Sequence, residues 1–224
     1  MAVKTGKLNE FIDWLIKKYP DKSINEYKGF TETIINDAKK NDSKNGCEKC
    51  ELTTEFQKVC DDNGFISLAH EFISEKNYKP TYNKIMNMFG ESSLFKNLNS
   101  KDEEALKEMC YSLGVQHGGA FRIFMMALLK DYTGCSENQI LDVDDSDCSP
   151  SLSDYPKENP SSTQKVTMNQ TANSISMQDY VKRVYAARKL YLKANRNSIS
   201  NWDIIIKNRY KKEENSINKT IYNK

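Results

Sequence analysis

A chain of 224 residues, with 29% charged residues and a mean hydropathy of −0.74, has enough apolar side chains for one modest core but not two. No apolar run reaches the roughly 20 residues that a membrane-spanning helix requires, so no transmembrane segment is expected. The net charge is only +2, but residues 180–224 carry twelve Lys/Arg against three Asp/Glu, a net +9, which leaves the remaining residues at −7. This asymmetry indicates a basic C-terminal segment that meets an acidic partner.

The first 20 residues do not resemble a secretory leader, because Asn9 and Asp13 interrupt the apolar run that a signal peptide needs. The sequence therefore predicts a cytoplasmic protein with reduced thiols. A secreted protein stays open if a leader has been removed. In that case the six cysteines would form up to three disulfides of unknown connectivity.

Apolar residues recur with helical spacing through the first part of the chain. The pattern predicts a helix over 8–19 that stops at Pro20, and a second over 23–40 that begins with a capping box of Ser23 and Glu26. Similar spacing predicts further helices over 52–60, 65–73, 80–89, 100–113 and 121–132. The most apolar stretch, Leu113–Cys135, is predicted to supply the central buried helix. No stretch alternates as a strand would, so we expect an all-α fold with a compact multi-helix core domain over residues 1–135.

The composition changes after Cys135. Residues 136–175 are rich in Asp, Ser and Pro and poor in large apolar side chains, which predicts an acidic, disordered linker. Residues 176–224 return to helical spacing and form a predicted basic, tyrosine-rich helical arm. Its last helix is predicted to begin at Ser200, with Asp203 completing a capping box.

The arm mixes cationic and aromatic side chains, as nucleic-acid binding requires: cations neutralise phosphates, and aromatic rings stack on bases. We therefore predict a non-enzymatic, nucleocapsid-like protein of viral type that binds RNA or another nucleic acid through this arm. The predicted contacts are Lys182, Arg183, Tyr185, Arg188, Lys189, Tyr191, Lys193, Arg196, Trp202, Lys207, Arg209, Lys211 and Lys212.

Four other interpretations of the arm stay open. It could bind an acidic protein surface or a second copy of the chain, it could be masked by the acidic linker, it could dock on an anionic membrane surface, or it could simply pack on the core. Frequent Asn and Lys are typical of AT-rich genomes, such as those of some parasites and large viruses. The main alternative is therefore a protein-interaction module, or an effector of a parasite or virus that binds a host protein.

A second alternative is a small zinc protein. Cys47 and Cys50 have the spacing of a zinc knuckle, and Cys60 and His70 could complete a tetrahedral Cys3His site. No second knuckle is present, and Cys60 and His70 lie within apolar helical patterns, where structural roles are common. No cofactor is otherwise expected.

The residues around His117, LGVQHGGAF, loosely resemble the setting of the proximal histidine in globin F helices, over Leu113–Leu129. The resemblance implies haem binding, but His70 lies too far away for a distal partner and Gly118-Gly119 would end the helix, so haem is not expected. The chain also lacks phosphate-loop, dinucleotide, zinc-protease and nucleophile-elbow motifs, so no enzymatic activity is predicted.

Overall fold

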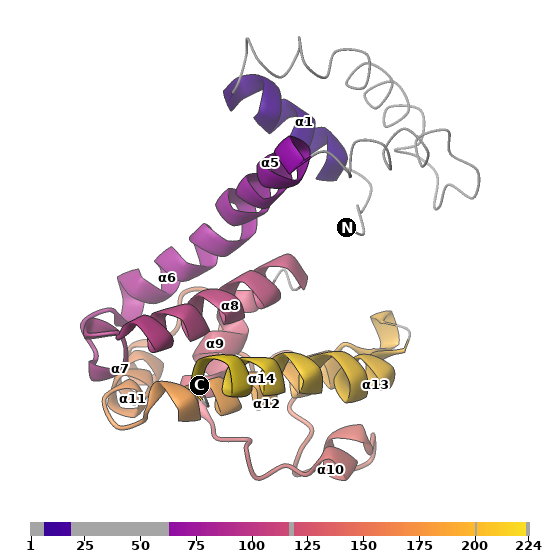
Figure 1. Cartoon of the computed structure of the whole chain (residues 1–224). Helices are drawn as coiled ribbons and strands as arrows, with labels where there is room; N and C mark the ends of the chain where they lie inside the picture. The colour runs from indigo at the N-terminus through magenta and orange to yellow at the C-terminus, as the bar shows by residue number, and fades with distance from the viewer. Residues whose placement is uncertain (1–6, 19–62, 117–118, 200, 223–224) are drawn as a thin grey trace. The chain divides into compact units, whose positions relative to one another are not determined.

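The structure is a computed structural model of the chain, and it describes residues 7–18, 63–116, 119–199 and 201–222. The chain divides into two compact units, Met1–Lys76 and Asn77–Lys224. All regular structure within the described ranges is helical (Figure 1), which confirms the predicted all-α class. No helix in these ranges is long and apolar enough to span a membrane.

In the first unit the structure describes helix α1 (Lys7–Lys18) and helix α5 (Asn63–Ile73), which confirms two of the predicted helices. A π-helical turn, η1 (Ser74–Tyr78), follows α5. The predicted helices over 23–40 and 52–60 lie outside the described residues.

Aromatic packing joins α1 to α5. The ring of Phe72 meets the rings of Phe11 and Trp14 edge to face, with centroids 5.2 and 5.5 Å apart. Trp14 Nε1 donates a hydrogen bond of 2.8 Å to Glu75, and Lys18 forms ion pairs with Glu71 and Glu75. The apolar stripe predicted for the first helix therefore faces a partner within its own unit.

The second unit contains the remaining described helices: α6 (Lys79–Phe89), α7 (Ser93–Lys96), α8 (Ser100–Gln116), α9 (Ala120–Leu129), α10 (Glu137–Leu141), α11 (Ser162–Ala172), α12 (Met177–Ala194), η2 (Arg196–Ser198), α13 (Trp202–Ile204), η3 (Ile205–Tyr210), α14 (Lys211–Ile217) and η4 (Asn218–Tyr222). Helices α6, α8, α9 and α12 confirm the existence of the helices predicted there.

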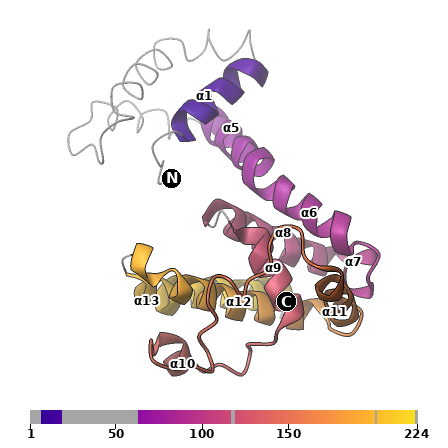
Figure 2. The same ribbon diagram turned by 180° about the vertical axis from the view of Figure 1, so that it is seen from behind.

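Helices α9 and α12 form the centre of the second unit. Helix α12 packs on α9 and α8, and α11 also packs on α9 (Figures 1 and 2). From α13 to η4 the chain runs back along α12 in the opposite direction (Figure 1). Helix α12 has buried side chains on several of its sides, as expected of a helix enclosed by others. They include Tyr180, Val181, Ala187 and Leu190. The α9 part of the predicted central stretch is thus buried, but α12 shares the centre with it.

Local sequence explains where these helices begin. Pro80 lies in the first turn of α6, where its missing N–H costs nothing, and Gly90 follows the last turn. Asn99 caps helix α8, because its Oδ1 accepts hydrogen bonds from the N–H groups of Lys101 and Asp102.

The structure also differs from the prediction over residues 136–175, which are folded rather than a disordered linker. Helices α10 and α11 lie in this segment, and a disulfide joins Cys135 to Cys148, with their Cα atoms 5.9 Å apart. This bond corrects the prediction of reduced thiols for these two cysteines.

A few large side chains anchor this segment to the core. Tyr155 is 1% exposed, and its hydroxyl donates a hydrogen bond of 2.6 Å to the carbonyl oxygen of Ala187. Arg122 donates to the carbonyl oxygens of Leu152, Tyr155 and Pro156, each at 2.8 Å. The serines that suggested disorder begin helices instead, because Ser136 and Ser161 form complete capping boxes.

Candidate functional site

The basic residues of α12 do not form an open cationic surface, and the clearest case is Arg188. Its side chain is fully buried. The guanidinium donates to Glu213 Oε2 at 2.6 Å and to the Ser112 hydroxyl at 3.0 Å. The ring of Tyr210 lies 3.9 Å from the guanidinium carbon, a close cation–π stack. Arg188 therefore ties α12 to α8 and to the C-terminal helices.

The carboxylate of Glu213 is held on both oxygens. Its Oε2 also accepts a hydrogen bond of 2.7 Å from Ser112, and its Oε1 accepts one of 2.8 Å from Arg209. Burial alone would raise the pKa of Glu213, but the charge of Arg188 and the hydrogen bonds from Ser112, Arg209 and Arg188 lower that pKa below its usual value. Glu213 is therefore a fixed anion at neutral pH.

Lys193, at the end of α12, is buried in a different way. Its ammonium donates to the carbonyl oxygens of Gln139 and Cys148, at 3.1 and 3.0 Å. Burial lowers the pKa of Lys193, although the charges of Asp145 and Asp142 act in the opposite direction. This lysine holds the disulfide-bonded segment against α12.

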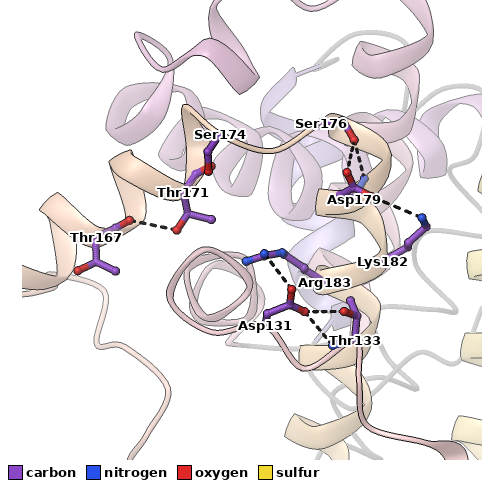
Figure 3. Close-up of polar contacts among 9 residues, drawn as sticks. All are labelled: Asp131, Thr133, Thr167, Thr171, Ser174, Ser176, Asp179, Lys182 and Arg183. Atoms are coloured by element: carbon purple, nitrogen blue, oxygen red, sulfur yellow. Dashed lines mark hydrogen bonds and ion pairs between the residues drawn. The ribbon is translucent and has the colours of Figure 1, made fainter.

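Other predicted nucleic-acid contacts are engaged in ion pairs. Each of four cations on α12 and α14 lies within 3.4 Å of a carboxylate oxygen: Lys182 with Asp179, Arg183 with Asp131, Lys189 with Glu214 and Lys211 with Glu137. Figure 3 shows the first two of these pairs, with Ser176 capping the start of α12 and Thr133 donating to Asp131. The remaining basic contacts, Lys207 and Lys212, are exposed, and Arg196 donates to the carbonyl oxygen of Lys193.

The predicted stacking residues are also enclosed. Tyr185 is fully buried, and Tyr191 packs edge to face on Tyr155 with centroids 5.0 Å apart. Trp202 is partly buried against the core. A base could not stack on Tyr185 without unpacking α12, so Tyr185 is a core residue, and Tyr191 and Trp202 are partly buried against the core.

Beside the Arg188 cluster lies a cavity of about 310 Å³. Helix α8 contributes Glu104, Glu108 and Ser112 from one face, because these residues are spaced by four. Helix α14 contributes Glu213, Ser216 and Ile217, and α12 contributes Tyr185. We refer to this space as the acidic cavity. Sequence reasoning missed it because Tyr185 and Glu213 come from positions far from Glu104 in the chain.

The acidic cavity is lined by three carboxylates, which are negatively charged hydrogen-bond acceptors. Glu213 is neutralised by two arginines, whereas Glu104 and Glu108 are exposed and make no ion pair within the part of the chain that the structure describes. The hydroxyl of Tyr185 is buried, and the described residues offer it no hydrogen-bond partner. Burial raises the pKa of Tyr185, so the hydroxyl stays neutral.

The predicted zinc site stays a prediction. Cys47, Cys50 and Cys60 lie outside the described residues, as does His117, and His70 is exposed on α5. Within residues 7–18, 63–116, 119–199 and 201–222, no three His, Cys, Asp or Glu residues are placed to hold a metal ion.

Fold and site together define an all-α protein in which several basic residues of the arm are buried or paired with carboxylates, beside an acidic cavity. The family described as "Type VI secretion system spike protein VgrG3-like, C-terminal" matches residues 1–174, and the chain belongs to this family. No curated protein and no solved structure matches the chain.

Family membership overturns the predicted function. A chain from a bacterial secretion spike family is not a viral, nucleocapsid-like, RNA-binding protein. The error came from counting the charges of residues 180–224 without their partners, since Arg188, Lys189 and Lys211 pair with Glu213, Glu214 and Glu137. The alternative prediction, a protein-interaction module or effector, agrees better with this family.

Proposed function

We propose that this chain is a partner-binding or effector module that leaves the producing bacterium together with a type VI secretion spike. The match of residues 1–174 to the C-terminal part of a VgrG3-like spike protein carries this proposal. The cytoplasmic location predicted from the sequence then applies only before export. The partner is proposed to be a protein, and not the parasite or viral host target named by the alternative prediction.

The disulfide supports action outside the cytoplasm. Cys135 and Cys148 are bonded in the structure, and such bonds persist in oxidising compartments but are rare in the bacterial cytoplasm. The bond joins the turn that follows α9 to the segment that Lys193 holds on α12. Oxidation after export would therefore complete the fold where the module acts.

The proposal is tested by comparing culture supernatants of two strains that express the tagged chain, one with an active and one with an inactivated type VI system. We expect the chain in the supernatant of the active strain only, with a cytoplasmic protein as the control for lysis. Thiol alkylation and mass spectrometry should find Cys135 and Cys148 linked in the exported pool and free in the cell. Equal amounts in both supernatants would contradict the proposal.

The same family membership favours assembly with other spike subunits. Light scattering after size exclusion, on the chain alone and after mixing with its spike protein, measures this directly. A complex whose mass exceeds that of the single chain is the expected result, and an unchanged monomer in both samples would argue against assembly.

A further inference from the structure

Residues 136–147, which the disulfide closes into a loop, rest on the second unit mainly through α10. We refer to them as the disulfide loop. Within α10, Ile140 is buried in the core, and Glu137 forms an ion pair that is exposed and therefore contributes little. Residues 142–144 and 146–147 are exposed. The position of the loop therefore depends on how its two ends are held.

Lys193 holds the loop from beneath, but its burial also opposes closure. The residue is 1% exposed, and its ammonium donates to the carbonyl oxygens of Gln139, inside the loop, and Cys148, at its end. Two carbonyl groups offset only part of the cost of removing an ammonium from water. On the pKa of Lys193, burial outweighs the charges of Asp145 and Asp142. An open loop would return this charge to water, so closure needs a further contribution.

The disulfide supplies that contribution, because it limits how far the two ends of the loop can separate. Its two ends differ in accessibility. Cys148 is buried, whereas Cys135 is partly exposed and follows Gly134, where an added side chain would meet no atom within 4 Å. Accessible disulfides are the ones that thiols reduce most readily. Cys135 is therefore the end at which a reductant would attack.

Reduction by a small thiol, such as glutathione, would proceed in two exchanges. The thiolate attacks the sulfur of Cys135, which forms a mixed disulfide there and releases Cys148 as a thiolate that takes up a proton. A second thiol then frees Cys135 and leaves with the first as the oxidised reductant. The protein gains two electrons and two protons, and the reductant supplies both.

We propose that the Cys135–Cys148 bond is a redox switch: reduction opens the disulfide loop and exposes Lys193, and oxidation closes the loop over it. The core stays packed in both forms, because Tyr155 and Arg122 hold the chain beyond the loop independently of the bond. That the open form belongs to the producing cell and the closed form to the exported protein rests on the proposed function. The switch itself does not.

The test is acetylation of lysines in the full chain by an N-hydroxysuccinimide ester, before and after treatment with dithiothreitol, followed by peptide mass spectrometry. Lys193 should react at least about tenfold faster in the reduced chain, because its loop then opens locally. Lys182, which is exposed in the closed form, should react at the same rate in both samples. An unchanged rate at Lys193, or an equal increase at Lys182, would overturn the proposal.

The buried thiol of Cys110 distinguishes an open loop from an unfolded unit. It is a free cysteine on α8 and is 0% exposed. Treatment of the reduced chain with a maleimide should modify Cys135 and Cys148 and leave Cys110 unmodified. Modification of Cys110 as fast as Lys193 is acetylated would mean that reduction unfolds the core, which overturns a switch confined to the loop.

Two variants separate this bond from the other cysteines of the chain. Cys135→Ser/Cys148→Ser should show the fast acetylation of Lys193 with and without dithiothreitol, with Cys110 still protected. Cys110→Ala keeps the bond and should keep the response to reductant. A double variant in which dithiothreitol still changes the rate at Lys193 would contradict the proposal.

A switch must also reset. Oxidised glutathione, added to the reduced wild type after the dithiothreitol is removed, should re-form the bond and restore the slow rate at Lys193. A fast rate that persists after the bond has re-formed would overturn the proposal. These measurements need only the purified chain, so a failure of export would leave the switch standing, and a failure of the switch would leave export untouched.

Discussion

Arg188 and Lys193 are two buried cations on the same helix, five residues apart, and their surroundings differ. Arg188 meets the carboxylate of Glu213, the hydroxyl of Ser112 and the ring of Tyr210. Lys193 meets two carbonyl oxygens, of Gln139 and Cys148, and no carboxylate contacts it within hydrogen-bond distance in the described structure. Arg188 has a direct carboxylate partner and joins helices, whereas Lys193 has only carbonyl partners within hydrogen-bond distance and holds a loop against α12.

The difference teaches how one helix can hold two segments in distinct ways. The Arg188 contacts depend on opposite charge, so they are strong as long as Glu213 is ionised. The Lys193 contacts depend on carbonyl dipoles, so the desolvation of the ammonium is only partly offset. We therefore expect substitutions of Arg188 and Lys193 to change the free energy of unfolding by different amounts and with a different dependence on pH.

The largest effect is expected for Arg188→Ala. It leaves the half-buried Glu213 without its main partner. Breaking a buried pair from one side typically costs about 3–5 kcal/mol, so we expect a loss at the lower end of that range. Urea unfolding followed by circular dichroism measures the loss. Arg209→Ala removes the exposed partner of the same carboxylate and should cost less than about 1 kcal/mol. Equal losses for the two variants would contradict this account of Arg188.

The same pair predicts an acid dependence. The pKa of Glu213 is lowered in the folded chain, so its stabilising contribution is present above the unfolded value of about 4.3 and is lost as the pH falls through the lowered pKa. The difference in unfolding free energy between the wild type and Arg188→Ala should therefore shrink in acid.

The next largest effect concerns the loop that Lys193 clamps. Cys135→Ala/Cys148→Ala opens a disulfide with a sequence separation of 13 residues, and we expect a loss of about 2–3 kcal/mol. Unfolding under oxidising conditions compares the double variant with the wild type. A loss below about 0.5 kcal/mol would show that the Lys193 contacts and Tyr155 hold the segment without the bond.

Lys193→Met is expected to cost about 1–2 kcal/mol, because it leaves two carbonyl oxygens unpaired but also relieves the burial of a charge. The pH response has the opposite sense to that of Glu213. The pKa of Lys193 is lowered in the folded chain, so its unfavourable contribution shrinks as the pH rises from that lowered value toward about 10.4. The difference in the free energy of unfolding between the wild type and Lys193→Met should therefore increase from pH 8 to pH 10. A difference that does not change with pH would contradict an unfavourable burial of the ammonium.

The smallest effect is expected at Arg183, whose ion pair with Asp131 is 2.9 Å long but borders solvent (Figure 3). Arg183→Ala should cost less than about 1 kcal/mol, with a smaller loss in 1 M salt. Thermal unfolding at low and high salt measures it. A loss comparable to that of Arg188→Ala would mean that burial is not what separates the two arginines.

The helices of this protein were largely predictable, because their apolar residues recur with the helical period. Arg188 also shares the side of α12 that carries Val184 and Leu192, so its inward position was visible in the sequence. Its partner was not, since Glu213 lies 25 residues further on and meets it only through the reversal of the chain.

The folded state of residues 136–175 could not be predicted from composition. Ser, Asp and Pro are frequent both in disordered segments and in segments whose side chains cap the local backbone. In this chain Ser136, Ser161 and Asp145 act as caps, and Tyr155 provides the anchor. The acidic cavity could not be predicted for a similar reason. In the sequence Glu104 and Glu108 look like any solvated glutamates, and only the fold brings α12 and α14 beside them.

The place of α12 has a consequence for how this chain can be divided. The family match ends at residue 174, before α12 begins at Met177. A fragment cut at that limit would lose the helix that covers α9, whose eight buried side chains include Phe124, Met125 and Leu128. Such a fragment would expose an apolar surface and aggregate. The region shared with the family is therefore shorter than the piece that must be expressed to obtain folded protein.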